Sequence, residues 1–64
     1  MVYKVIANYN IFAKPHSWTK GLDYEVTEKA NYFILTSNEG QVNYMNKVKS
    51  EVLNNFKPYL NDKR

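Results

Sequence analysis

The sequence predicts a mainly β fold, made of an antiparallel meander and one C-terminal helix. Residues 22–27 and 41–45 alternate apolar and polar side chains with period two, as in strands with one solvated face. Between them, residues 32–36 are uncharged and rich in aromatic and β-branched side chains. Residues 37–40 favour a tight turn because asparagine and glycine tolerate the left-handed backbone region. Residues 29–31 provide the other turn of this three-stranded meander.

The N-terminal third predicts one strand followed by a long loop. Residues 2–7 read as the strand, and the alternation then lapses over residues 8–20, where Pro15 removes a backbone donor. A loop of about a dozen residues is long for a compact domain, which makes it a candidate binding loop. We expect Ile11 and Phe12 to tuck beneath it as a plug.

The apolar spacing changes after residue 45, from two to three and four. This change predicts a helix over residues 46–55 with Asn46 as its N-cap. Pro58 ends the helical pattern, so residues 56–60 are expected as an extended closing segment or a tail. Most of the core is expected to come from Leu22, Tyr24, Val26, Phe33, Leu35, Val42 and Val52.

Residues 18–26, followed by residues 32–35 and 38–40, resemble small SH3-like β-barrel proteins of phages, prophages and plasmids of Gram-positive bacteria. The resemblance covers about residues 18–45. It implies a single SH3-like domain over residues 1–64, folded as an antiparallel β-barrel of four to five strands. Such proteins usually have a short 3₁₀ turn and a last strand where this sequence predicts a helix. Those with known roles bind a protein or a nucleic acid.

Composition narrows the function classes. The chain has 64 residues, no cysteine and one histidine, so it predicts one domain without disulfides, metal or cofactor. No stretch approaches the roughly 20 apolar residues of a membrane span, and no secretory signal is apparent. We therefore expect a cytoplasmic protein that does not bind membranes. The net charge of +3 is mild, with an acidic meander between two basic ends.

Catalytic chemistry is poorly represented. His16 and Ser17 are adjacent, but no third group is evident to orient the imidazole, which is expected to be exposed in a loop. Asp23 and Glu25 share one strand face and fit its solvated side. The two glycines lie 19 positions apart (40 − 21), so no phosphate-binding loop is present. The sequence therefore predicts a protein that is not an enzyme.

Binding is the class of function that the residues favour. Trp18 either caps the core or serves as an exposed anchor, because tryptophan and tyrosine dominate binding hot spots. Six tyrosines, three phenylalanines and one tryptophan are too many for so small a core, so some rings must be exposed. The expected partner-binding residues are Trp18, His16, Lys14, Lys20, Tyr9 and Tyr32.

The residues leave three kinds of partner open. The first is another protein, which makes the chain a protein-interaction module; a mobile-element protein that binds and inhibits a host factor is one such case. The alternative is a small nucleic-acid-binding β-barrel, in which exposed rings stack on bases and lysines follow phosphates. A third is a homo-oligomer that forms through a strand edge or the helix.

Overall fold

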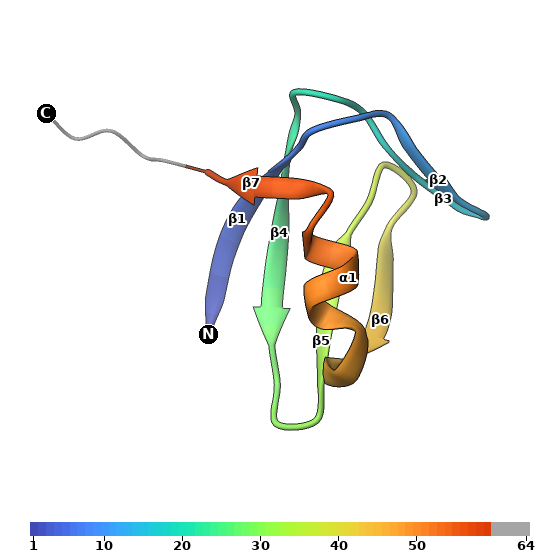
Figure 1. The fold of residues 1–64 in the computed structure, drawn as a ribbon. Coiled ribbons are helices and arrows are strands. Elements are labelled where there is room, and N and C mark those ends of the chain that lie inside the picture. Colours follow the sequence, from blue (N-terminus) through green and yellow to red (C-terminus); the bar gives the residue numbers. More distant parts are fainter. Residues whose placement is uncertain (60–64) are drawn as a thin grey trace, which may run out of the picture.

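The chain folds into a five-stranded antiparallel sheet and a separate two-stranded hairpin (Figure 1). The computed structural model describes residues 1–59. Within them the elements are β1 Val2–Ala7, β2 Ile11–Ala13, β3 His16–Trp18, β4 Asp23–Glu28, β5 Tyr32–Thr36, β6 Gln41–Met45, the 3₁₀ helix η1 Asn46–Val48, α1 Lys49–Leu53 and β7 Phe56–Pro58. The prediction of a mainly β fold with one C-terminal helix is confirmed. The predicted strand count is too low, because a hairpin lies inside the segment expected to be a loop.

The main sheet has the order β6-β5-β4-β1-β7. β4, β5 and β6 form the expected meander, with Val26 opposite Leu35 and Phe33 opposite Tyr44. β1 pairs with β4 along most of its length, and its last three residues also pair with β7, where Ala7 faces Phe56. The closing segment expected over residues 56–60 is therefore a strand as far as Pro58, whereas Leu60 lies outside the described residues.

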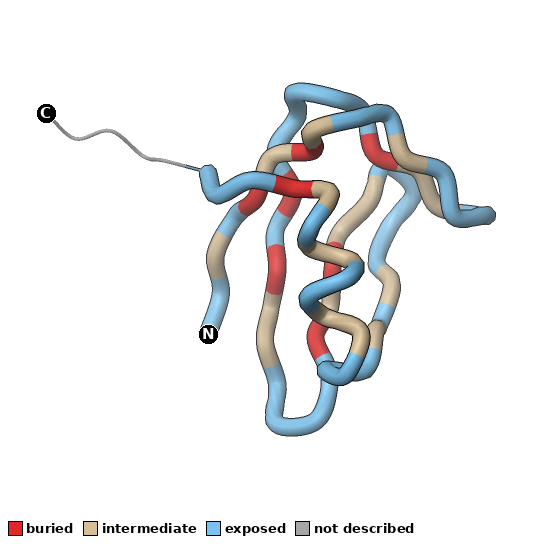
Figure 2. The backbone as a smooth tube through the Cα atoms, in the orientation of Figure 1, coloured by how far each residue is buried: buried red, intermediate tan, exposed pale blue. Residues whose placement is uncertain are grey.

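The core lies between the inner face of this sheet and the elements that cover it (Figure 2). Val26, Phe33 and Leu35 are fully buried, because period-two alternation places them on one face of β4 and β5. Phe56 closes the core from β7 and meets Trp18 and Tyr24 edge-to-face. The complete set of buried residues is Val5, Ala7, Trp18, Tyr24, Val26, Phe33, Leu35 and Phe56.

Most of the predicted core is confirmed, but Leu22 is not part of it. Leu22 is 50% exposed because it precedes β4 in the turn that begins at Thr19, and its backbone N–H bonds the Thr19 carbonyl. Gly21 has a φ of 89° in that turn, a conformation that side chains disfavour. Val42 and Val52 are half-buried and pack against the core from its margin.

The predicted single helix over residues 46–55 is wrong in form. The segment divides into η1 and a five-residue α1, whose Val52 and Leu53 pack against the core. Asn46 does not cap it; its side-chain amide donates instead to the Ala30 carbonyl (3.2 Å). The helix ends early because Phe56 must reach the core, and Asn8 N–H bonds Asn55 O (2.9 Å) just before β7 begins.

Two leucine truncations test this assignment of the core. Leu35→Ala should cost about 2–5 kcal/mol of unfolding free energy, because it empties a fully buried site. Leu22→Ala should stay within about 0.5 kcal/mol of the wild type, as surface substitutions do. Urea unfolding followed by circular dichroism measures both. Similar losses at the two positions would contradict the core described above.

Candidate functional site

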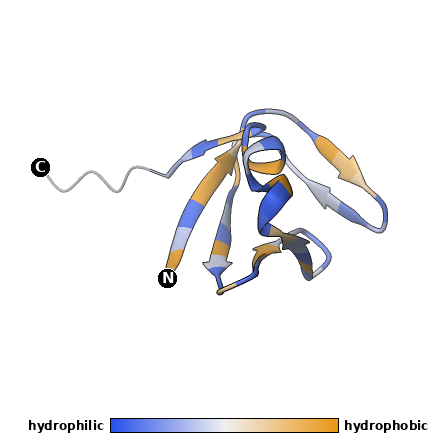
Figure 3. Ribbon diagram, turned by 60° about the horizontal axis from the view of Figure 1, so that its bottom comes forward, coloured by the Kyte–Doolittle hydropathy of each residue, from blue (hydrophilic) through white to orange (hydrophobic). Residues whose placement is uncertain are grey.

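The segment expected as a long loop contains the β2–β3 hairpin, which extends away from the main sheet (Figures 1 and 3). Ile11 faces Trp18, Phe12 faces Ser17 and Ala13 faces His16 across it. The turn at Lys14 and Pro15 contains a cis peptide bond. In Figure 3, β2 has the hydrophobic colour along its length.

Trp18 anchors this hairpin to the body of the protein. Its side chain is only 3% exposed, and the indole N–H donates to the Thr36 carbonyl (2.7 Å). Buried tryptophan needs such an acceptor for its N–H group. The role of exposed anchor predicted for Trp18 is therefore wrong, because the ring completes the core beside Phe56. The other alternative, a core tryptophan, is the observed one.

The β5–β6 turn holds β3 in place through polar contacts. The Glu39 carboxylate accepts hydrogen bonds from the Ser17 N–H (2.6 Å) and the Ser17 hydroxyl (2.5 Å). The bond from the Ser17 hydroxyl keeps the pKa of Glu39 below its ordinary value. Asn38 N–H donates to Ser17 O (3.0 Å), and the Tyr24 hydroxyl donates to the Asn38 side chain (2.9 Å). The hairpin base is thus fixed in one orientation.

His16 belongs to the same contact and is not the exposed loop histidine that was predicted. It is half-buried in β3, tilted against Trp18, with Nδ1 2.7 Å from the Ser37 hydroxyl oxygen. That oxygen also accepts the N–H groups of Glu39 and Gly40, at 3.2 Å each. The His16 ring and these two N–H groups thus converge on one hydroxyl oxygen in the β5–β6 turn. This serine and histidine therefore shape a turn.

Phe12 is the aromatic side chain that the hairpin exposes. It is 77% exposed, so the prediction that it tucks beneath the loop is wrong, whereas Ile11 does pack against the core. Neighbouring residues of a strand point to opposite faces, so burying Ile11 turns Phe12 outward. Recognising a hairpin over residues 11–18 would have placed Ile11 and Phe12 on opposite faces, without showing which face is buried. We call the exposed side chains of this region the hairpin surface; it comprises Tyr9, Phe12, Lys14 and Lys20.

The structure brings some of the predicted binding residues together and separates another. Tyr9 (61% exposed) and Lys20 lie on the two connections at the hairpin base, where Lys20 N–H bonds the Asn10 side chain (2.8 Å). Tyr32 starts β5 at the opposite end from Thr36, which contacts Trp18. About 13 Å of strand separates those two positions. Tyr32 therefore lies outside the hairpin surface.

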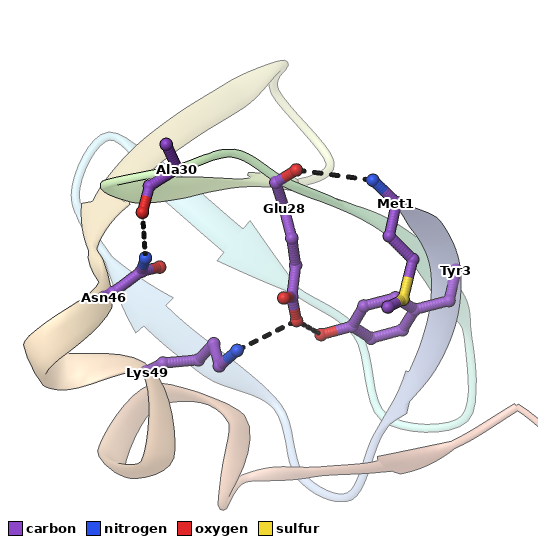
Figure 4. A network of polar contacts seen from close by, with 6 residues as sticks. All are labelled: Met1, Tyr3, Glu28, Ala30, Asn46 and Lys49. Carbon is purple, nitrogen blue, oxygen red and sulfur yellow. Dashed lines mark hydrogen bonds and ion pairs between the residues drawn. The ribbon is translucent and has the colours of Figure 1, made fainter.

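A second polar cluster lies away from the hairpin, around Glu28 (Figure 4). Its carboxylate accepts hydrogen bonds from the Tyr3 hydroxyl (2.6 Å) and the Lys49 ammonium (3.0 Å). Both bonds lower the pKa of Glu28, and the bond from Tyr3 has the larger effect. The pKa of Tyr3 is raised to about 12, mainly because the hydroxyl is partly buried and secondly because it is bonded to Glu28. The cluster joins β1, β4 and α1, so it holds the helix against the sheet.

The other two acidic residues of the meander belong to a solvated face. Asp23 and Glu25 are exposed on the outer side of β4, as predicted, and Asp23 pairs with Lys4 at 3.5 Å.

Residues 1–59 contain no group of three side chains suited to a metal ion, and no pocket forms among them. None of the helices in that range is long and apolar enough to cross a membrane.

Comparisons with protein-family models, curated proteins and solved structures find no significant match to this chain.

The Glu28 cluster predicts how stability depends on pH. A lowered pKa in the folded state means that Glu28 stabilises fully above its ordinary value of 4.5 and loses this effect as the pH falls through its lower folded value. Glu28→Gln should therefore lose less stability than the wild type between neutral pH and pH values below 4.5. Urea unfolding at both pH values measures the difference.

Tyr3→Phe checks the same cluster from the other side. The raised pKa of Tyr3 stabilises the fold fully below the ordinary value of 10, and this contribution disappears as the pH rises towards 12. Tyr3→Phe should remove that alkaline component and also weaken the acid dependence. Identical acid profiles for the wild type, Glu28→Gln and Tyr3→Phe would disprove the coupling.

Proposed function

We propose that this chain is a non-enzymatic protein-interaction module that binds its partner through the hairpin surface, with Phe12 as the anchor. The observation that carries the proposal is the 77% exposure of Phe12 on a hairpin whose base is fixed to the sheet. An exposed aromatic side chain has most of its apolar area left to bury, and such rings act as anchors at interfaces.

The way the hairpin is held favours binding. Ser17 is bonded to Glu39 through both its N–H and its hydroxyl, and Trp18 is bonded to Thr36. A binding segment that is already ordered loses less conformational entropy when the partner arrives. Phe12, directly opposite Ser17, is therefore presented on a prepared scaffold.

The charges around Phe12 suggest the chemistry of the partner. Lys14 in the hairpin turn and Lys20 at its base are exposed, and neither forms an ion pair within residues 1–59. A partner with an apolar pocket for Phe12 and acidic groups at the rim would complement this surface. Rim charges of this kind mainly set the association rate and the selectivity.

The proposal includes an SH3-like fold and a mobile-element setting. The order β6-β5-β4-β1-β7, with the 3₁₀ helix Asn46–Val48 and α1 before the last strand, supports an SH3-like fold. The mobile-element setting rests on the sequence resemblance of residues 18–45 to SH3-like proteins of phages and plasmids. In SH3-like folds the first long loop commonly contributes to the ligand surface, and here that segment is the hairpin. By this analogy the partner is a host protein that the chain inhibits in the cytoplasm.

Photo-crosslinking followed by titration tests the proposal. A photoreactive phenylalanine at position 12 should capture the partner from host extract, whereas the same group at Leu22 should not. With the purified partner, Phe12→Ala should weaken binding at least about tenfold at unchanged thermal stability, because the anchor loses its ring. Leu22→Ala, also an exposed apolar truncation, is the matched control and should bind as the wild type does.

A nucleic-acid titration provides the opposing outcome. Mixed-sequence oligonucleotides should bind weakly at low salt and at physiological salt. Tight binding that falls by about a thousandfold between the two salt concentrations would overturn the proposal in favour of phosphate recognition by lysines. If the wild type and Phe12→Ala bind the partner with equal affinity, the hairpin surface anchored by Phe12 is not the binding site.

A further inference from the structure

β6 is an edge strand whose outer side pairs with nothing within residues 1–59. Two backbone hydrogen bonds show which opposite residues of β5 and β6 form hydrogen-bonded pairs. Ser37 N–H donates to Gly40 O (2.7 Å) at one end of the ladder, and Asn46 N–H donates to Asn31 O (3.3 Å) at the other. Hydrogen-bonded pairs alternate with non-bonded pairs along an antiparallel ladder. The register therefore directs the N–H and C=O groups of every second β6 residue away from β5. These residues are Gln41, Asn43 and Met45.

The two edge strands of the sheet, β6 and β7, differ in how well they are protected against pairing with a further strand. β7 is three residues long and contains Lys57 and Pro58, a charge and a missing donor that discourage further pairing. β6 is five residues long and contains neither a charged residue nor proline. Its backbone groups thus form an unprotected template for another strand.

We propose that β6 pairs antiparallel with β6 of a second copy of this chain, about a two-fold axis at Asn43. In this register Asn43 lies opposite Asn43 of the other copy, and Gln41 lies opposite Met45. All three residues direct backbone N–H and C=O groups outward, so every facing pair can exchange hydrogen bonds. The two main sheets then continue as one sheet across the dimer.

The composition of β6 suits pairing with itself. A two-fold contact places the same patch against itself, so a charge near its centre would meet its own copy. β6 has no charge, and Asn43 and Gln41 are polar side chains that can hydrogen-bond across the contact. An opposite-charge pattern that would select a different strand is absent from β6.

The side chains on the inner face favour the same arrangement. The register sets Val42 opposite Tyr44 of the second copy; both are only half-buried in the single chain, although Tyr44 already packs on Phe33 with ring centroids 5.6 Å apart. On the outer face Met45 is 60% exposed. Pairing would cover these apolar groups, and aromatic–β-branched pairs across strands are stabilising. None of the residues of the hairpin surface belongs to β6, so the inference does not depend on the proposed function.

Charge substitutions at Asn43 test the dimer. Analytical ultracentrifugation of the full chain should show a monomer–dimer equilibrium. Asn43→Lys and Asn43→Asp should each weaken dimerisation at least about tenfold, because each charge faces its own copy. An equimolar mixture of the two variants should restore dimers, since opposite charges then meet. Asn54→Lys makes the same change at an exposed residue after α1 and should dimerise as the wild type does.

A cysteine variant checks the register independently. Hydrogen-bonded antiparallel pairs have Cα atoms about 5.5 Å apart, so a short thiol-specific crosslinker reaches between two side chains at such a pair. Since the chain has no cysteine of its own, Asn43→Cys treated with a short bis-maleimide should give a covalent dimer, and Asn54→Cys should not. Thermal unfolding of each variant confirms that it is folded. A wild-type chain that stays monomeric at about 1 mM, or dimers indifferent to charge at position 43, would overturn the proposal.

Discussion

A buried indole N–H must find an acceptor, and Trp18 finds it in the Thr36 carbonyl, at the end of the strand that carries the core residues Phe33 and Leu35. This contact joins the two sheets of the protein. Because Trp18 faces Ile11 across the hairpin, burying the indole also turns Ile11 inward and Phe12 outward. The exposed aromatic surface is thus a consequence of how the core is completed.

The chain is short, and polar contacts contribute where the core is thin. A helix of five residues is not stable alone in water, so α1 depends on the packing of Val52 and Leu53 and on the bond from Lys49 to Glu28. The same carboxylate also binds the Tyr3 hydroxyl on β1. The Glu28 side chain thus holds together β1, β4 and α1, which are distant in sequence. These contacts compensate for the limited apolar area of a 64-residue domain.

The two proposed contact surfaces use different chemistry. The hairpin surface presents a phenyl ring with lysines nearby, which suits a partner with an apolar pocket and an acidic rim. The β6 edge presents backbone hydrogen-bonding groups, which suit only an extended strand. They lie on separate sheets, so a dimer formed through β6 would present two hairpins. Such a dimer would bind a repeated or symmetric partner with increased avidity.

The sequence by itself determined the meander. Alternation over residues 22–27 and 41–45 is a local property, and it predicted both the strands and their buried faces, apart from Leu22, which the turn before β4 leaves exposed. The tertiary structure decided that Trp18 is buried and Phe12 is exposed, because both are large rings and only the space beside Phe56 selects one of them for the core. It also decided where the helix ends, since local spacing favours its continuation while the pairing of β7 with β1 requires the chain to extend. Such outcomes depend on contacts between residues far apart in sequence, which periodicity does not encode.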